Sequence, residues 1–146
     1  MSILIIRAAI SSGLATLGFA ILFNIKRDKL FYAALTGAIG GILYKVCFHY
    51  GLGEYLSNFI AAIGLSLCSE IFARYCKTPV STFLVCALIP LVPGGFLFRM
   101  ILCVMEGTLS QAIEYSIVTI SIALVLTIGI LFVSTMVQLY YKARRH

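Results

Sequence analysis

The feature that most limits how this chain can fold is a series of long apolar runs separated by short connections. Each run reaches or exceeds the roughly 20 residues that a helix needs to cross the apolar core of a bilayer. The period-two alternation of a membrane β-barrel is absent. We therefore predict an all-α polytopic membrane protein in which residues 1–146 form a single domain of five transmembrane helices. The predicted spans cover residues 2–24, 30–49, 55–75, 79–105 and 109–139.

The composition excludes an ordinary soluble domain. Of the residues, 62% are hydrophobic and 11% are charged, whereas about 25% of the residues in a soluble domain are charged. The first apolar run is too long for a signal peptide and has no basic segment before it, so we expect it to remain as a span. The five cysteines include no C-x-x-C pair. We therefore expect no disulfide framework, no metal site and no cofactor.

The basic residues predict an orientation. Eight of the 11 Lys and Arg residues fall on one side of a five-span chain: Lys26, Arg27, Lys29, Arg74, Lys77, Lys142, Arg144 and Arg145. The connections on the other side carry Glu54 and Glu106 and no basic residue. The positive-inside rule then places the N-terminus outside and the C-terminus in the cytoplasm. Arg7, Lys45 and Arg99 lie in the outer halves of spans and do not follow this pattern. The basic cytoplasmic rim explains the net charge of +6, so we expect no nucleic-acid partner.

The fourth apolar run contains the sequence ALIPLVPGG, which a continuous helix would not favour. Pro90 and Pro93 each remove a backbone N–H from the helix. Gly94 and Gly95 let the backbone bend and be approached closely. We predict that this span is broken at the P-x-x-P-G-G motif into two half-helices. Irregular backbone at membrane depth is tolerated only where it is buried in protein or lines a wet cavity.

A break of this kind can bind a charged substrate. The amide groups that begin the second half-helix favour an anion such as a carboxylate. The carbonyl groups of Cys86 and Ile89, which end the first half-helix, favour a cation such as an ammonium group. Discontinuous helices bind the substrates of transporters in this way. The alternative is a proline kink that neighbouring helices or water relieve. The candidate substrate-binding residues are Pro90, Pro93, Gly94, Gly95 and Arg99.

Two charged residues inside the predicted spans leave alternatives open. Arg99 lies four residues after Gly95, on the same helix face, and could pair with a substrate carboxylate. It could instead extend to the outer interface or pair with Glu106. Glu70 and Arg74 have the spacing of an intrahelical ion pair. Glu70 is also a candidate for a protonatable group that couples transport to a proton gradient.

The remaining patterns concern packing and catalysis. Gly37 and Gly41, together with Ala33, form a ridge of small residues that favours close helix packing. The Ser/His/Asp combinations, metalloprotease motifs and phosphate-binding loops typical of enzymes do not occur in the sequence. We therefore expect that the protein is not an enzyme.

Three stretches carry a resemblance to a known family: GFAILFN, LTGAIGGILYKV and ALIPLVPGGFLF. With them, the chain resembles the small membrane subunit of the two-component threonine/serine exporter family, over about residues 8–138. Pro90, Pro93 and Gly94 match the P-x-x-P-G core of that family. The resemblance implies a partner, namely a larger subunit with a cytoplasmic N-terminal domain and its own membrane spans.

The resemblance also implies a function. We expect a subunit that exports small amino acids, threonine and serine, across the plasma membrane, which is the inner membrane of a bacterium. Besides the partner subunit and the lipid bilayer, the chain would contact a small substrate that bears a carboxylate. One alternative cargo is a dicarboxylate such as succinate, for which Arg99 or Lys45 would supply the second cationic contact. Another alternative is a membrane scaffold that stabilises a partner without transporting anything.

Overall fold

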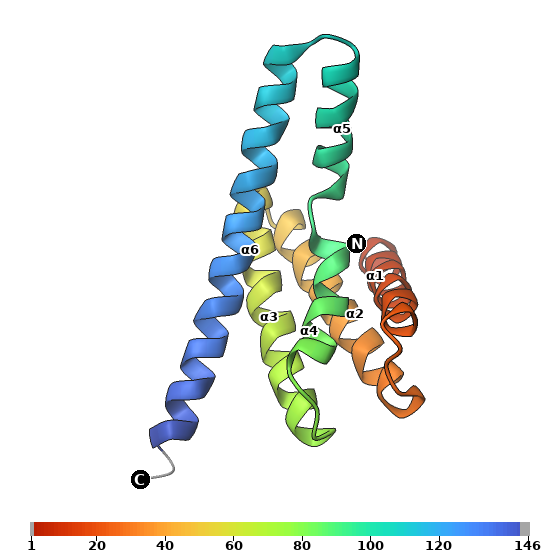
Figure 1. Ribbon diagram of the computed structural model, residues 1–146, viewed down its shortest axis with the longest axis vertical. Coiled ribbons are helices and arrows are strands. Elements are labelled where there is room, and N and C mark those ends of the chain that lie inside the picture. Colours follow the sequence, from red (N-terminus) through yellow and green to blue (C-terminus); the bar gives the residue numbers. More distant parts are fainter. Residues whose placement is uncertain (1, 144–146) are drawn as a thin grey trace.

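Helices make up almost all of the computed structural model, which describes residues 2–143 (Figure 1). In chain order they are α1 (Ser2–Leu22), α2 (Arg27–His49), α3 (Gly53–Tyr75), α4 (Ser81–Leu88), the 3₁₀ turn η1 (Ile89–Leu91), α5 (Gly94–Met105) and α6 (Leu109–Ala143). No strand occurs in that range, so the prediction of an all-α protein is confirmed. Arg144 and Arg145, which were assigned to the basic rim, lie outside the described residues.

Four of these helices are long and apolar enough to cross a membrane. They comprise residues 3–22 of α1 and the whole of α2, α3 and α6. The pair Ser81–Leu91 and Gly94–Met105 would add a fifth span if its two parts cross together. These two parts meet at a bend of 50°. The described residues therefore contain four or five candidate spans.

Some helix boundaries differ from those expected. Helix α2 begins at Arg27 instead of residue 30, since Asp28 occupies its first turn, where the helix dipole favours an acid. Helix α6 continues to Ala143 instead of 139, because the residues that follow the apolar run are still compatible with a helix. Helix α4 begins at Ser81 instead of residue 79.

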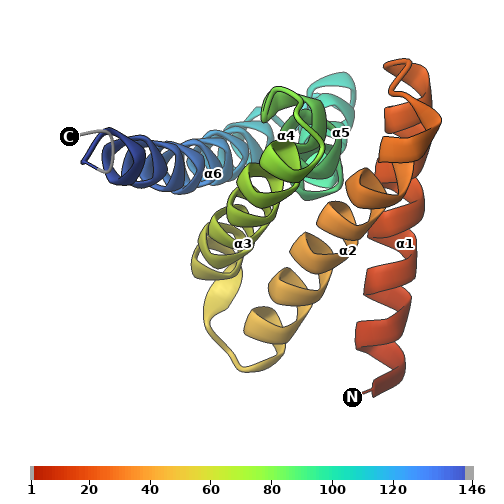
Figure 2. The same ribbon diagram turned by 90° about the horizontal axis from the view of Figure 1, so that it is seen from below.

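The helices pack both against chain neighbours and against helices far apart in the sequence. Helix α1 packs on α2, α2 on α3, and α3 on α6, whereas α4 contacts α1, α2 and α3. Viewed from below, α1 lies at one edge of the bundle and α6 extends to the other (Figure 2). Small residues form much of the buried interior, among them Ala20, Ala33, Ala61, Ala62 and Ala73. Small side chains allow the helix backbones to approach closely.

The glycines at 37 and 41 lie where α2 crosses α1. A Cβ atom added at Gly37 would lie 2.6 Å from Cβ of Thr16, and one added at Gly41 would lie 2.7 Å from Cβ of Ser12. Both distances are well below the roughly 3.5 Å at which carbon atoms make favourable contact. A side chain at either position would therefore force α1 and α2 apart.

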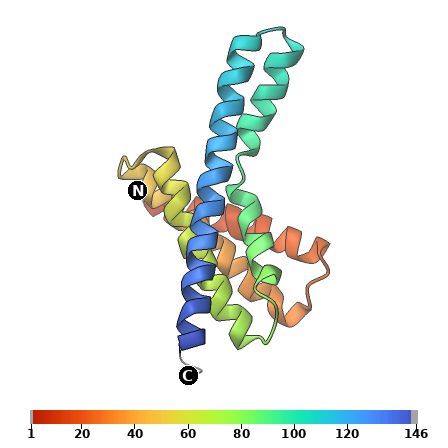
Figure 3. The same cartoon turned by 60° about the vertical axis from the view of Figure 1, so that its left-hand side comes forward.

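Helix α6 extends beyond the rest of the bundle. Its 35 residues correspond to a length of about 52 Å. Its N-terminal half packs with α5, and the two form a hairpin that projects past α1 to α4 (Figure 3). The break between η1 and α5 lies at the base of this hairpin.

The basic segments gather at the opposite end of the molecule. The connection after α1, the connection after α3 and the C-terminal end of α6 all lie there (Figure 1). Asn24 and Lys77 adopt left-handed φ angles of 54° and 51° in these connections, a conformation that commonly ends a helix. The basic residues of this end are Lys26, Arg27, Lys29, Arg74, Lys77 and Lys142.

Candidate functional site

The backbone changes direction between η1 and α5. The amide of Val92 donates to the carbonyl oxygens of Leu88 and Ile89, at 3.2 Å each. Val92 then adopts an extended conformation, with φ −59° and ψ 134°. The carbonyl of Ile89, which we expected to lack a donor and so to be open to a cation, thus accepts a hydrogen bond within the chain, and that expectation is wrong. The chain tightens into a 3₁₀ turn before the break, and such a turn satisfies carbonyl groups that a proline leaves without an α-helical donor.

The first turn of α5 presents free amide groups. The N–H of Gly94 donates to the carbonyl of Val92 at 2.7 Å. Between residues 2 and 143, no backbone acceptor is recorded for the N–H groups of Gly95 and Phe96. A Cβ added at Gly94 or Gly95 would meet no atom within 4 Å. The two glycines thus leave open space in front of a helix N-terminus, where an anion is favoured.

A cavity of about 350 Å³ lies at the break. Cavities that bind small molecules measure roughly 300–1,000 Å³. The whole motif lines it, and so does the arginine that follows: Pro90, Leu91, Val92, Pro93, Gly94, Gly95, Phe96 and Arg99. The structure therefore brings all five candidate substrate-binding residues to a single cavity.

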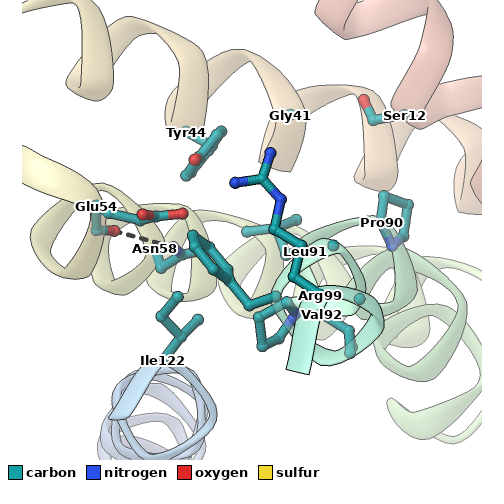
Figure 4. A pocket seen from close by; sticks show the side chains of 14 residues that line it. Ser12, Gly41, Tyr44, Glu54, Asn58, Pro90, Leu91, Val92, Arg99 and Ile122 are labelled. Carbon is teal, nitrogen blue, oxygen red and sulfur yellow. Dashed lines mark hydrogen bonds between the residues drawn. The ribbon is translucent and has the colours of Figure 1, made fainter. Parts of the chain in front are cut away.

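The other walls come from four different helices. Helix α1 contributes Ser12, α6 contributes Ile122, and the remaining lining residues are Gly41 and Tyr44 of α2 and Glu54 and Asn58 of α3 (Figure 4). No sequence pattern predicted a site role for Ser12, Tyr44, Glu54 or Asn58. A polar Asn58 inside an apolar run, four residues after Glu54, was the signal that could have identified the α3 wall.

Arg99 reaches the cavity from α5. Figure 4 shows its side chain extending towards α2, where Gly41 and Tyr44 lie. The structure records a single ion pair for residues 2–143, between Arg74 and Glu70. Arg99 is therefore paired neither with Glu106 nor with Glu54, although Glu54 lines the same cavity. Its guanidinium group is available to a ligand.

A second, wider groove adjoins this cavity between α1 and α2. It measures about 810 Å³, is lined by Arg7 and Lys45, and shares Ser12, Gly41, Tyr44 and Pro90 with the cavity. The described basic residues that do not belong to the basic end are Arg7, Lys45 and Arg99. Arg99 lines the cavity, and Arg7 and Lys45 line the groove. Their positions at these two spaces explain why they lie apart from the basic residues of the connections.

Glu70 lies away from the cavity. It is 8% exposed, and its Oε2 atom accepts a hydrogen bond of 3.1 Å from Nη2 of Arg74. The guanidinium carbon of Arg74 in turn lies 3.6 Å from the ring centroid of Tyr141. This arrangement fastens α3 to the C-terminal part of α6. A role for Glu70 in proton coupling stays a prediction.

A family comparison decides what kind of protein carries this site. The family described as "Threonine/Serine exporter, ThrE" matches residues 8–136. The chain belongs to this exporter family. The exporter is a multi-pass membrane protein with a role in threonine and serine export, and the matched residues include every residue that lines the cavity. No solved structure matches the exporter. In the described part of the exporter, no group of three His, Cys, Asp or Glu side chains could hold a metal ion.

Proposed function

We propose that this chain is the small membrane subunit of a two-component exporter that moves threonine and serine across the plasma membrane. Membership of the exporter family supports the transport role. The proposal of a substrate site rests on the cavity at the broken helix. Its unpaired Arg99 and the free amides of α5 provide hydrogen-bond donors and positive charge for a carboxylate.

We also propose that the chain crosses the membrane five times, with α4, η1 and α5 acting as one broken span. An odd number of spans puts the termini on opposite sides. The N-terminus would be outside, and the basic end would face the cytoplasm, in line with the positive-inside rule. The gathering of basic connections at one end supports this arrangement.

The proposed partner is a larger subunit with a cytoplasmic N-terminal domain and its own spans. The surface of the hairpin formed by α5 and α6 supports the proposal of a partner. Its large apolar side chains are exposed, among them Leu97, Phe98, Ile101, Leu109, Ile113 and Ile117. Lipid and the larger subunit would share this surface. We therefore expect that the chain alone does not transport.

The test is co-expression with the candidate larger subunit, followed by affinity purification and reconstitution in vesicles. The complex is expected to move labelled threonine and serine, and the chain by itself is expected to be inactive. Full efflux from the chain alone would contradict the two-component assignment.

The same vesicles separate the alternative functions. Movement of labelled succinate that unlabelled succinate competes with, but threonine does not, would identify a dicarboxylate exporter. Stable binding of the partner without movement of either substrate would identify a scaffold. The neighbouring groove with Arg7 and Lys45 could receive a second carboxylate, so the succinate measurement is an essential arm of the assay.

A further inference from the structure

The wall of the cavity opposite α5 is formed by the first turns of α3. Glu54 and Asn58 are four residues apart and therefore share one face of this helix. Asn58 is only 3% exposed, and its Nδ2 donates to the carbonyl of Glu54 at 2.9 Å. This bond fixes the orientation of the Asn58 amide. The carbonyl oxygen of Glu54 is an acceptor, so the NH₂ group of Asn58, and not its oxygen, must face it. The remaining Oδ1 atom is thus an acceptor, and no donor to it is recorded between residues 2 and 143.

Glu54 adds a charge to this wall. It lines the cavity from α3 (Figure 4), and it makes no ion pair within the described residues. The α3 wall therefore offers a carboxylate and a fixed amide oxygen, both of which accept hydrogen bonds. It suits a donor that carries positive charge.

The opposite wall, formed by α5, offers hydrogen-bond donors instead of acceptors. Arg99 and the amides of Gly95 and Phe96 can only donate hydrogen bonds. One cavity thus contains a carboxylate and a guanidinium that are not paired with each other. At short range, each of these charges attracts a ligand group of the opposite charge. A ligand that carries both an ammonium and a carboxylate group would satisfy both walls at once.

We infer that Glu54 and Asn58 bind the ammonium group of the cargo while Arg99 and the start of α5 bind its carboxylate. This inference rests on the proposed function, because it assigns the substrate contacts of the same site. It makes Glu54 the residue that selects amino acids over dicarboxylates, since a second carboxylate beside Glu54 would be repelled. It also requires a free amino group on the cargo.

The simpler explanation of Glu54 is structural. It occupies the first turn of α3, where an acidic residue stabilises a helix through the dipole. A structural role predicts that substitution of Glu54 changes the stability of the protein and the binding of all ligands alike. A binding role predicts a change that depends on the amino group of the ligand.

The experiment measures ligand binding to the purified two-subunit complex by isothermal titration calorimetry. The ligands are threonine, N-acetylthreonine, which keeps the carboxylate but lacks the ammonium charge, and succinate. The wild-type complex is expected to bind threonine much more tightly than the other two. Glu54→Gln should weaken threonine binding by at least about tenfold and leave N-acetylthreonine binding unchanged or stronger. Arg99→Gln should weaken the binding of both.

The control variant is Glu106→Gln, which removes an exposed acid outside the cavity and should bind like wild type. Asn58→Leu removes the amide oxygen and should also weaken threonine selectively. Unchanged threonine binding by Glu54→Gln, or an equal loss for threonine and N-acetylthreonine, would overturn the inference and leave the proposed exporter intact. Serine and other free amino acids are titrated into the wild-type complex in the same way. Binding of the others but not of threonine or serine would support the ammonium site and overturn the proposed cargo. A wild-type preference for succinate would overturn both.

Discussion

The close crossing of α1 and α2 provides the sharpest test of the fold, through the substitution Gly37→Ala. The added Cβ would lie 2.6 Å from Cβ of Thr16, about 1 Å closer than a favourable carbon contact. Overpacking of this kind destabilises proteins by about 1–3 kcal/mol. Alanine is a better helix former than glycine by up to about 1 kcal/mol. The new methyl group would meet three side-chain atoms of Thr16 at once, so the upper half of the overpacking range applies. After the gain in helix propensity is subtracted, we expect a net destabilisation of about 1–2 kcal/mol.

Gly18→Ala is the matched control on the partner helix. A Cβ at Gly18 would meet no atom within 4 Å, so this variant should be as stable as wild type or slightly more stable. The assay is unfolding of the purified protein by detergent titration, with helicity followed by circular dichroism.

A second substitution tests the specific contact. Adding Thr16→Gly to Gly37→Ala removes the side chain that the new methyl group would meet, so it should recover part of the lost stability. Equal stabilities of Gly37→Ala, Gly18→Ala and wild type would refute the argument that α1 and α2 are held together at Gly37.

Three further predictions concern the site and the topology. Pro93→Ala should restore a donor and favour a continuous helix, so efflux should fall strongly at an unchanged protein level; wild-type efflux would reduce the break to a kink. Glu70→Gln removes the partner of Arg74 and should lower thermal stability while efflux continues, and an efflux that no longer depends on pH would instead identify Glu70 as the coupling group. In a variant whose five native cysteines are replaced, single cysteines placed at residues 28 and 77 should be labelled from the cytoplasm and one at residue 52 from outside; cytoplasmic labelling at 52 would contradict the proposed orientation.

The helices and the break could be predicted because their signals are local. Apolar runs of sufficient length locate the helices, and the two prolines and two glycines locate the irregular backbone. A local pattern also made Arg99 a candidate site residue, since an arginine in an apolar run is unusual wherever it occurs. One local detail was wrong, because the sequence did not reveal that a 3₁₀ turn would satisfy the carbonyl of Ile89.

The walls of the cavity could not be predicted in the same way. Ser12, Tyr44 and Glu54 reach it from three separate helices, and their convergence depends on the crossing angles of those helices. The ridge at Gly37 and Gly41 predicted that another helix crosses α2 closely, but it did not indicate which helix. Only the structure shows that α1, with Thr16 and Ser12, lies against this ridge.

The break in the fourth apolar run also affects how the chain enters the membrane during synthesis. Helix α5 has only 12 residues and carries Arg99, whose insertion at the centre of a helix costs about 2.5–3.5 kcal/mol on translocon scales. Helix α6 follows after a connection of three residues and is the most apolar of the four long candidate spans. The translocon would therefore integrate α5 and α6 together as a helical hairpin. A nascent chain that ends before α6 should leave the broken segment outside the lipid, so α6 would determine whether the proposed substrate site forms.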